Sequence, residues 1–354
     1  MPLDDLRAGS DPLPPYGRGG RSIALTVVVP VLNEERNLAA LVQRLVPVLE
    51  GLTERFEIIF VDDGSSDRTL AVIAEANLRE PRLKAISLSR RFGKEIALSA
   101  GLRRAVGDAV IMIDADLQHP PEVIRDMVAR WREGYDVVYG QRRDRESDSR
   151  LRRAFAHGFY GLFRSISGTS MPEGAGDFRL LDRRAVNAFN QLGERARFNK
   201  GLYAWIGFKS VGVPFEVAER HAGASRFRFA SLTRFALDGL TSFSTVPLRI
   251  STYLGLAVSS AAFLYALIFL AKTLFKGIDQ PGFPTTIIAI MLLGGIQLIS
   301  LGVIGEYLGR VYEEVKARPL YIEAETVGAL GVISPVADGT GRPHTSSGSG
   351  AGQR

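Results

Sequence analysis

Two aspartates, Asp114 and Asp116, follow a short apolar run over residues 109–113. The run predicts a buried β-strand, and side chains two apart on a strand point to the same side. Pro121 suits the first turn of a helix that we expect to run to about Glu133. Two carboxylates at the end of a core strand, where a sheet opens into a crevice, suit a hard divalent cation and a phosphorylated ligand. A solvated loop is the alternative, because Asp-x-Asp is a common pattern.

Polar residues also mark the ends of two earlier predicted strands. Apolar runs over residues 24–31 and 57–62 are typical of strands. Asn33 and Glu34 follow the first run, and Asp62 ends the second. Ligands of parallel sheets bind beyond the carboxyl ends of the strands. Polar residues at three such ends therefore favour a ligand site over solvated loops.

The remaining pattern of the first half alternates between strands and helices. The pattern predicts strands over residues 83–88 and 136–139 and a helix over residues 93–105. This alternation predicts an α/β fold with a mainly parallel, Rossmann-like sheet and helices on both faces. No Gly-x-Gly-x-x-Gly follows the first strand and no Walker loop precedes Lys94, so a dinucleotide-binding or P-loop protein is disfavoured.

The composition restricts the chemistry further. The 354 residues carry a formal net charge of +6, which favours anionic partners such as a phosphorylated substrate or a membrane surface. No cysteine is present, which excludes disulfides and cysteine-based zinc sites. Four histidines are scattered without the spacing of metal ligands, at positions 119, 157, 221 and 344.

Two long uncharged stretches follow the α/β pattern, Ile250 to Ala271 and Thr285 to Gly305. Each is long enough to span a hydrocarbon core, and the short linker between them predicts a hairpin. Basic residues flank the pair on both sides, so the positive-inside rule places both flanks in the cytoplasm. Residues 227–249 are either a juxtamembrane segment on the membrane surface or an ordinary amphipathic helix.

Four motifs occur in order between Val29 and Pro120 and resemble those of a known family, and the resemblance covers about residues 23–316. They are Val29–Glu35 (VPVLNEE), Val61–Asp67 (VDDGSSD), Phe92–Glu95 (FGKE) and Asp114–Pro120 (DADLQHP). The set resembles family 2 glycosyltransferases of the GT-A fold. More narrowly, it is similar to the polyprenyl-phosphate glycosyltransferases of the dolichyl-phosphate-mannose-synthase-like group.

The resemblance implies an enzyme that moves a sugar from a nucleotide-diphosphate sugar to a polyprenyl phosphate, with inversion. It implies the catalytic carboxylates Asp116, Asp177 and Asp114. It implies Mg²⁺ or Mn²⁺ held by Asp116, with Asp114 and Gln118 nearby. The nucleotide sugar is expected at Pro30, Asn33, Glu34, Asp62, Lys94, Asp114 and Gln118. The lipid phosphate is expected at Arg142, Arg153 and Arg220.

Some of these assignments have simpler alternatives. The arginine-rich run over 142–153 could be a solvated charged face, although Arg is well suited to grip phosphate. Asp177 lies in Gly174–Asp182, which reads as a loop entering a short strand, and Asp in such a turn is commonly a turn former. If the resemblance to the family holds, Asp177 acts either as a catalytic base or as a group that orients the reactants. Arg91 and Arg226 stand where the family carries Asn and Lys.

Two other functions are open to such a chain. A processive polysaccharide synthase of the same superfamily would carry Gln-x-x-Arg-Trp, and neither Trp131 nor Trp205 lies in that motif. A non-catalytic scaffold that binds nucleotide sugar would tolerate loss of Asp-x-Asp or of Lys94, and both are intact. The basic residues lack the interleaved aromatics of a nucleic-acid reader, so no nucleic acid is expected.

The predicted organisation has five parts. They are a disordered segment 1–21, a GT-A domain 22–226, a juxtamembrane segment 227–249, a transmembrane hairpin 250–318 and a largely disordered tail 319–354. We expect a multi-pass homo-oligomer in the inner membrane, acting in cell-envelope glycan or lipid modification. Its catalytic domain and both termini would lie in the cytoplasm.

Overall fold

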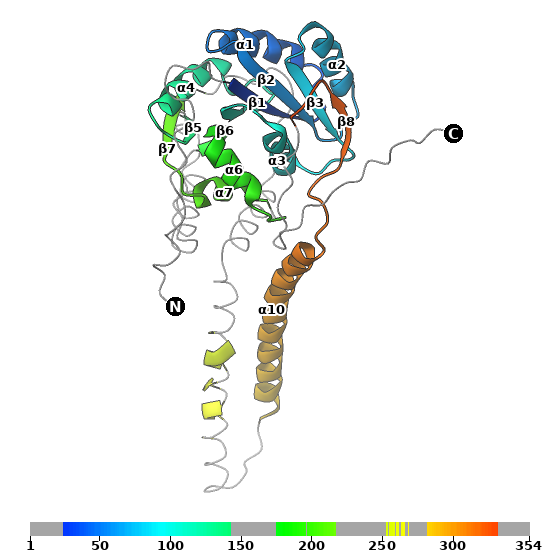
Figure 1. The fold of residues 1–354 in the computed structure, drawn as a ribbon. Helices are drawn as coiled ribbons and strands as arrows, with labels where there is room; N and C mark the ends of the chain where they lie inside the picture. The colour runs from blue at the N-terminus through cyan, green and yellow to red at the C-terminus, as the bar shows by residue number, and fades with distance from the viewer. Residues whose placement is uncertain are drawn as a thin grey trace, which may run out of the picture.

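The computed structural model describes residues 24–142, 175–195, 197–216 and 282–331, with scattered residues between 253 and 268 (Figure 1). The expected segments 1–21 and 227–249 lie outside the described residues. The described part is a layered α/β domain with one long helix running away from it (Figure 1). This confirms the predicted α/β fold.

The first half of the domain supplies four parallel strands. They are β1 (Ala24–Val31), β2 (Arg55–Asp62), β3 (Leu83–Leu88) and β4 (Ala109–Met112). β1 pairs with β2 on one side and β4 on the other, and β3 extends the sheet beyond β2. Nearly every residue of these strands is buried. Helices cover both faces of the sheet, which is why the strands read as continuous apolar runs in the sequence.

The second half contributes strands of both directions. They are β5 (Val137–Arg142), β6 (Ala175–Asp182), β7 (Ser210–Phe215) and β8 (Glu323–Val327). The sheet order is β7-β5-β6-β4-β1-β2-β3-β8. β6 is antiparallel to both β4 and β5, and β7 is parallel to β5. The short strand expected within residues 174–182 is present, but the loop expected before it is not, because β6 takes almost the whole segment.

β8 lies within the tail 319–354 that we expect to be largely disordered. Its residues 323–327 pair with the edge of β3, so the ordered part of the chain extends past residue 319. Arg104 donates to both carboxylate oxygens of Glu323 at 3.1 and 2.6 Å, which fixes the strand from the side. Without β8, the backbone groups along the outer side of β3 would have no strand partner. Residues 332–354 lie outside the described residues.

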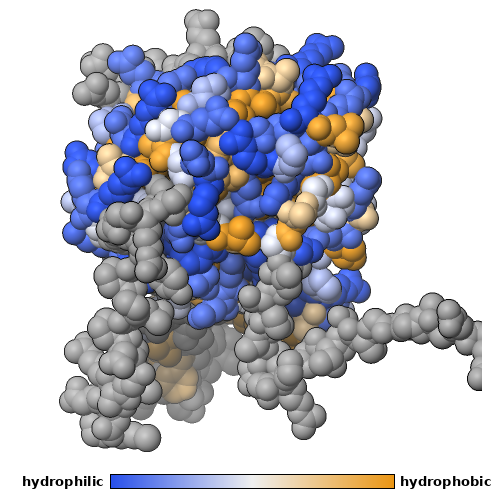
Figure 2. All heavy atoms as spheres, turned by 45° about the horizontal axis from the view of Figure 1, so that its top comes forward, coloured by the Kyte–Doolittle hydropathy of each residue, from blue (hydrophilic) through white to orange (hydrophobic). Residues whose placement is uncertain are grey.

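Helices cover both faces of the sheet (Figure 1). One face carries α1 (Leu38–Glu50), α2 (Thr69–Arg79) and α4 (Ile124–Arg132), the last preceded by the 3-10 turn η2 (Pro121–Val123). The other face carries α3 (Lys94–Arg104), α6 (Arg183–Gln191) and α7 (Asn199–Trp205). The face that Figure 2 presents is mostly hydrophilic, with hydrophobic residues in separate small areas. The buried hydrophobic residues form two cores, one between the sheet and the helices on each of its faces.

The long helix α10 (Phe283–Val315) exposes large apolar side chains. Its Leu298 and Leu301 side chains are 70% and 62% exposed. Residues 292–315 are long and apolar enough to cross a membrane, with a mean hydropathy of 1.4. The expected second span, 285–305, lies within α10, whereas most of the expected first span, 250–271, lies outside the described residues.

The end of α10 is attached to the α/β domain. The backbone N–H of Arg195 donates to Glu314 Oε1 at 2.7 Å, and the Arg195 side chain donates to the carbonyl oxygen of Arg318. Arg195 follows α6 and Glu314 lies in the last turn of α10. The C-terminal end of α10 therefore contacts the domain through Arg195, and the segment that follows the helix joins the sheet as β8.

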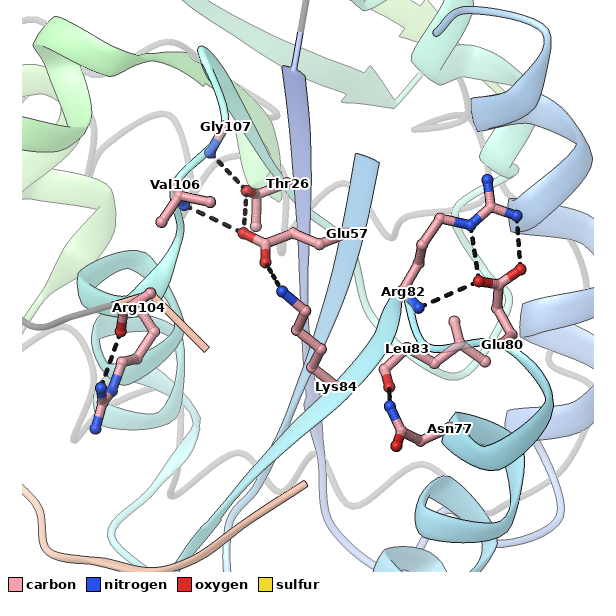
Figure 3. A network of polar contacts seen from close by, with 11 residues as sticks. Thr26, Glu57, Asn77, Glu80, Arg82, Leu83, Lys84, Arg104, Val106 and Gly107 are labelled. Carbon is pink, nitrogen blue, oxygen red and sulfur yellow. Dashed lines mark hydrogen bonds and ion pairs between the residues drawn. The ribbon is translucent and has the colours of Figure 1, made fainter. Parts of the chain in front are cut away.

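At the amino ends of the central strands, a polar network replaces apolar packing (Figure 3). Glu57 accepts hydrogen bonds from Thr26 Oγ1 at 2.7 Å and from Lys84 Nζ at 2.7 Å. The N–H of Val106 also donates to Glu57, at 3.2 Å, and the N–H of Gly107 donates to Thr26 Oγ1 at 2.9 Å. Glu57 is buried, so these contacts compensate for the loss of water around its charge. The network joins β1, β2 and β3 at the end opposite the polar strand ends.

Candidate active site

A cleft opens at the carboxyl ends of the strands, where the topology predicts one. The chain proceeds outward from β1 to β2 and β3 and then returns to β4 on the other side of β1. Sheets of this kind bind ligands at such a reversal of strand order. The pocket found there measures about 230 Å³. It is lined by Pro30, Val31, Leu32, Glu34, Asp63, Arg91, Lys94, Ala97, Asp114, Ala115 and Asp116.

Lys94 joins two of the predicted catalytic carboxylates. Its Nζ lies 2.6 Å from Asp114 Oδ1 and 2.9 Å from Asp177 Oδ2. Burial opposes the charged ammonium, but the two carboxylates outweigh it and raise the pKa of Lys94. Lys94 is the first residue of α3, Asp114 follows β4 and Asp177 lies in β6. The ion pairs thus hold three elements together beside the cleft.

The position of Lys94 depends on Asp63, which follows β2. Asp63 Oδ1 accepts from the N–H of Phe92 at 2.6 Å, and Oδ2 accepts from the N–H of Gly93 at 2.9 Å. Gly93 has a φ of 106°, a conformation that a residue with a side chain rarely adopts. A carboxylate at the start of α3 also complements the positive end of the helix dipole. Asp63 therefore positions the lysine, a role that no sequence motif indicated.

The loop after β4 turns sharply between Asp116 and His119. Leu117 has a φ of 61°, and Asp116 Oδ1 accepts from the N–H of Gln118 at 3.1 Å. One ligand atom each from Asp114, Asp116 and His119 lie within 4.8 Å of one another. The histidines show no metal-ligand spacing in the sequence, but the turn brings His119 beside the two aspartates.

The donor set at this loop fits a divalent cation. Two carboxylates supply the oxygen atoms that Mg²⁺ and Mn²⁺ bind. His119 Nδ1 is buried and has no hydrogen-bond partner among the described residues, and it lies 3.8 Å from Asp114 Oδ2. Burial lowers the pKa of His119, although Asp114 opposes this, so the imidazole is kept in the neutral form that binds metals.

A buried pair of carboxylates lies beside Lys94, with opposite pKa shifts. Burial raises the pKa of Glu95 to about 7, with a further contribution from the charge of Asp177. Burial acts the same way on Asp177, but Lys94 and Lys200 outweigh it and lower the pKa of Asp177 to about 2. Glu95 is held by Asn199, whose N–H donates to Glu95 Oε2 at 3.2 Å. At neutral pH, Asp177 is therefore charged and Glu95 is partly protonated.

The raised pKa of Glu95 predicts a pH dependence of stability. Between pH 4.5, the ordinary pKa of a glutamate, and about pH 7, the folded state binds more protons at this site than the unfolded state. The free energy of unfolding then falls as pH rises through this window. The variant Glu95→Gln cannot ionise, so we expect it to lose this slope and to be the more stable protein above about pH 7.

This prediction is checked by thermal melting of both proteins in detergent across the window. Glu75→Gln is the matched control, because Glu75 is 62% exposed and its ion-pair partner Arg68 is exposed as well. A Glu95→Gln melting profile parallel to that of the wild type would contradict the assignment.

The other predicted nucleotide-binding residues lie at neighbouring positions. Asn33, with a φ of 57°, accepts from the N–H of Ser66 at 2.8 Å, and Glu34 accepts from Asn37 Nδ2 at 2.6 Å. Asp62 is buried and accepts from the N–H of Ser65 at 3.1 Å and from Ser87 Oγ at 3.0 Å.

Asp62 faces a second, more open hollow rather than the cleft. This hollow measures about 600 Å³ and includes Ser87 on β3 and Glu325 on β8 in its lining. Pro30, Glu34, Lys94, Asp114 and Asp116 are thus gathered around one cleft, whereas Asp62 lines the adjoining hollow.

The predicted lipid-phosphate site is described only in part. Arg142 is the last residue of β5 and is exposed. Arg153 and Arg220 lie outside the described residues. Their roles stay predictions.

Sequence comparison agrees with the division into an α/β domain and an apolar C-terminal part. Residues 26–189 match Glycosyl transferase family 2, and residues 246–311 match the GtrB C-terminal hairpin.

Several full-length relatives are also similar. An uncharacterized glycosyltransferase of Synechocystis sp. is 49% identical over 307 residues, covering 87% of this chain and 96% of that protein. The SfII prophage-derived bactoprenol glucosyl transferase of Shigella flexneri is 45% identical over 298 residues, covering 84% and 96%. Among solved structures, glucosyl-3-phosphoglycerate synthase from Mycobacterium tuberculosis gives a TM-score of 0.45 at 21% identity, covering 62% of this chain and 79% of that one. The chain therefore belongs to the family 2 glycosyltransferases, in the group of polyprenyl-phosphate glycosyltransferases that carry a GtrB C-terminal hairpin.

Proposed function

We propose that this enzyme transfers a sugar from a nucleotide-diphosphate sugar to a polyprenyl phosphate, with inversion, at the cytoplasmic face of the inner membrane. The observation that carries the proposal is the Asp114–Lys94–Asp177 ion-pair chain in a strand-end cleft. Relatives of this protein that are named bactoprenol glucosyl transferases support a polyprenyl acceptor. The exposed apolar side chains of α10 support a lipid environment for that helix. We propose that the enzyme is a homo-oligomer acting in cell-envelope glycan or lipid modification.

The donor would lie in the cleft with its diphosphate toward the loop after β4. Asp114 and Asp116, with Gln118 and His119 nearby, would hold Mg²⁺ or Mn²⁺. Such an ion supplies positive charge that stabilises a diphosphate leaving group. Pro30, Glu34 and Asp62, which line the cleft and the adjoining hollow, would contact the nucleotide together with Asn33.

The reaction is a single displacement at the anomeric carbon. An oxygen of the acceptor phosphate forms the new bond to that carbon, and the bond to the nucleoside diphosphate breaks with its electron pair. A monoester phosphate has its second pKa near roughly 6, so the nucleophile is largely ionised at neutral pH without a base. Arg142, Arg153 and Arg220 would offset the repulsion between acceptor and donor phosphates.

This chemistry assigns an orienting role to Asp177. Its pKa of about 2 makes it a poor proton acceptor, and its ion pair with Lys94 fixes the ammonium in the cleft. We expect Asp177→Asn to lower kcat by about a hundredfold while leaving the pH profile of kcat unchanged in shape. Steady-state kinetics from about pH 6 to about pH 9 test this. Loss of an ionisation from the profile would instead identify Asp177 as the base.

The proposed function is tested with full-length protein in detergent. Labelled nucleotide sugars are incubated with polyprenyl phosphate and Mn²⁺ or Mg²⁺, and label extracted into organic solvent is counted with and without EDTA. We expect extractable label from one donor, dependent on both lipid and metal. A long water-soluble product would favour a processive synthase, and donor binding without transfer would favour a scaffold.

A further inference from the structure

We infer that His119 supplies a nitrogen ligand to the divalent ion of this active site and so determines a preference for Mn²⁺ over Mg²⁺. The inference rests on the proposed function, which places an ion at Asp114 and Asp116. It adds a ligand of a different chemical type to the oxygen donors that the sequence predicts.

The ring of His119 is held in place by two aromatic side chains. Its centroid lies 5.2 Å from that of Phe178 on β6 and 5.5 Å from that of Phe215 on β7. The two phenyl rings meet edge to face at 5.7 Å. The imidazole side chain is only 15% exposed. Packing from two strands therefore fixes the ring plane, as a preorganised ligand requires.

The Nδ1 atom has no partner in the protein part that is described. It is buried from solvent without a hydrogen bond. Its distance of 3.8 Å to Asp114 Oδ2 is too long for a hydrogen bond. A buried polar atom without a hydrogen bond destabilises the folded state, so its presence calls for an explanation such as an ion.

The spacing around Nδ1 is that of ligands sharing one ion. Metal–ligand bonds of about 2.0 to 2.3 Å place two ligand atoms up to roughly 4.5 Å apart. The ligand atoms of Asp114, Asp116 and His119 lie within 4.8 Å of one another, so small adjustments complete the set. Asp114 Oδ1 is engaged by Lys94 at 2.6 Å, which leaves Oδ2, the oxygen near His119, for the ion.

A nitrogen ligand changes which ions bind well. Mg²⁺ takes oxygen ligands almost exclusively, whereas imidazole binds first-row transition ions. Substitution of the histidine by an oxygen donor should therefore weaken Mn²⁺ more than Mg²⁺. We expect His119→Gln to reduce the ratio of Mn²⁺ to Mg²⁺ affinity by at least about tenfold, because loss of even an outer-shell partner costs roughly 10–100-fold in metal affinity.

The test is pulsed electron paramagnetic resonance of Mn²⁺ bound to the full-length protein in detergent. Wild-type protein should show ¹⁴N modulation, and protein labelled with ¹⁵N-histidine should show the ¹⁵N signal in its place. The isotope experiment requires no substitution and so is independent of folding. His119→Gln should abolish the nitrogen signal, whereas the control His344→Gln should retain it.

The outcomes separate this inference from the proposed function. Mn²⁺ bound to wild-type protein without nitrogen coupling overturns the role of His119 and leaves the enzyme assignment intact. Nitrogen coupling that persists in His119→Gln also overturns it. Failure of wild-type protein to bind Mn²⁺, together with sugar transfer that EDTA does not affect, overturns the metal site of the proposed function itself.

Discussion

Replacing Asp116 with Asn is expected to reduce sugar transfer by about a thousandfold or more while the protein stays folded. The carboxylate contributes negative charge toward the ion, and an active-site ion supplies several kcal/mol of transition-state stabilisation, each 1.36 kcal/mol being tenfold in rate. Asn keeps an oxygen that can accept the Gln118 N–H, which Asp116 accepts at 3.1 Å. The loop after β4 should therefore persist. The measurement is kcat by lipid-extractable label, alongside the thermal midpoint.

Asp126→Asn is the matched control for this substitution. Asp126 is exposed in the first turn of α4, so the same chemical change there should leave turnover unaltered and lower the melting temperature only slightly, through the lost interaction with the helix dipole. Wild-type turnover in the Asp116→Asn enzyme would contradict the assignment of the metal site. A large fall in its thermal midpoint would show instead that the loop depends on the charge.

Replacing Lys94 with Met is expected to lower turnover by at least about a hundredfold. The change leaves Asp114 and Asp177 without the ammonium that lies 2.6 and 2.9 Å from them. Loss of that charge should also raise the pKa of Asp177, because Lys94 contributes the largest favourable charge interaction with it. The measurement is kcat for folded protein, with the folded fraction determined by melting at the assay temperature.

The structure offers a control lysine that lies in an ion pair away from the cleft. Lys84 Nζ lies 2.7 Å from Glu57 Oε2 in the network of Figure 3, and the two side chains are 18% and 7% exposed. Lys84→Met should cost about 3–5 kcal/mol of stability, as expected for a broken buried ion pair, but leave the kcat of the folded fraction unchanged. Equal losses of kcat in the two variants would make Lys94 a structural residue only.

The sequence was sufficient for the central strands and for the position of the cleft. β1, β2 and β3 are continuous apolar runs because helices cover both faces, and such runs are visible in the sequence itself. Their polar ends then converge because parallel strands end at one edge. These features depend on local pattern, and so they were predictable.

Features that depend on pairing between distant segments were missed. β6 begins in a Gly-rich stretch that resembles a loop, yet it becomes a strand because β4 and β5 flank it. β8 has the polar sequence EAETV, and its extended form comes from the open edge of β3. The approach of His119 to Asp114 depends on the positive φ of Leu117. A bulky residue in that conformation is not indicated by any residue pattern.

The position of β8 limits the number of times that the chain can cross a bilayer. β8 follows α10 in sequence, and β1 to β7 precede it, yet all belong to one sheet. A sheet lies wholly on one side of a membrane, so the number of crossings between residues 216 and 323 must be even. If α10 crosses the bilayer, at least one other segment between residues 216 and 323 must cross it as well. Because the chain has no cysteine, single cysteines introduced one at a time and labelled from each side would count the crossings directly.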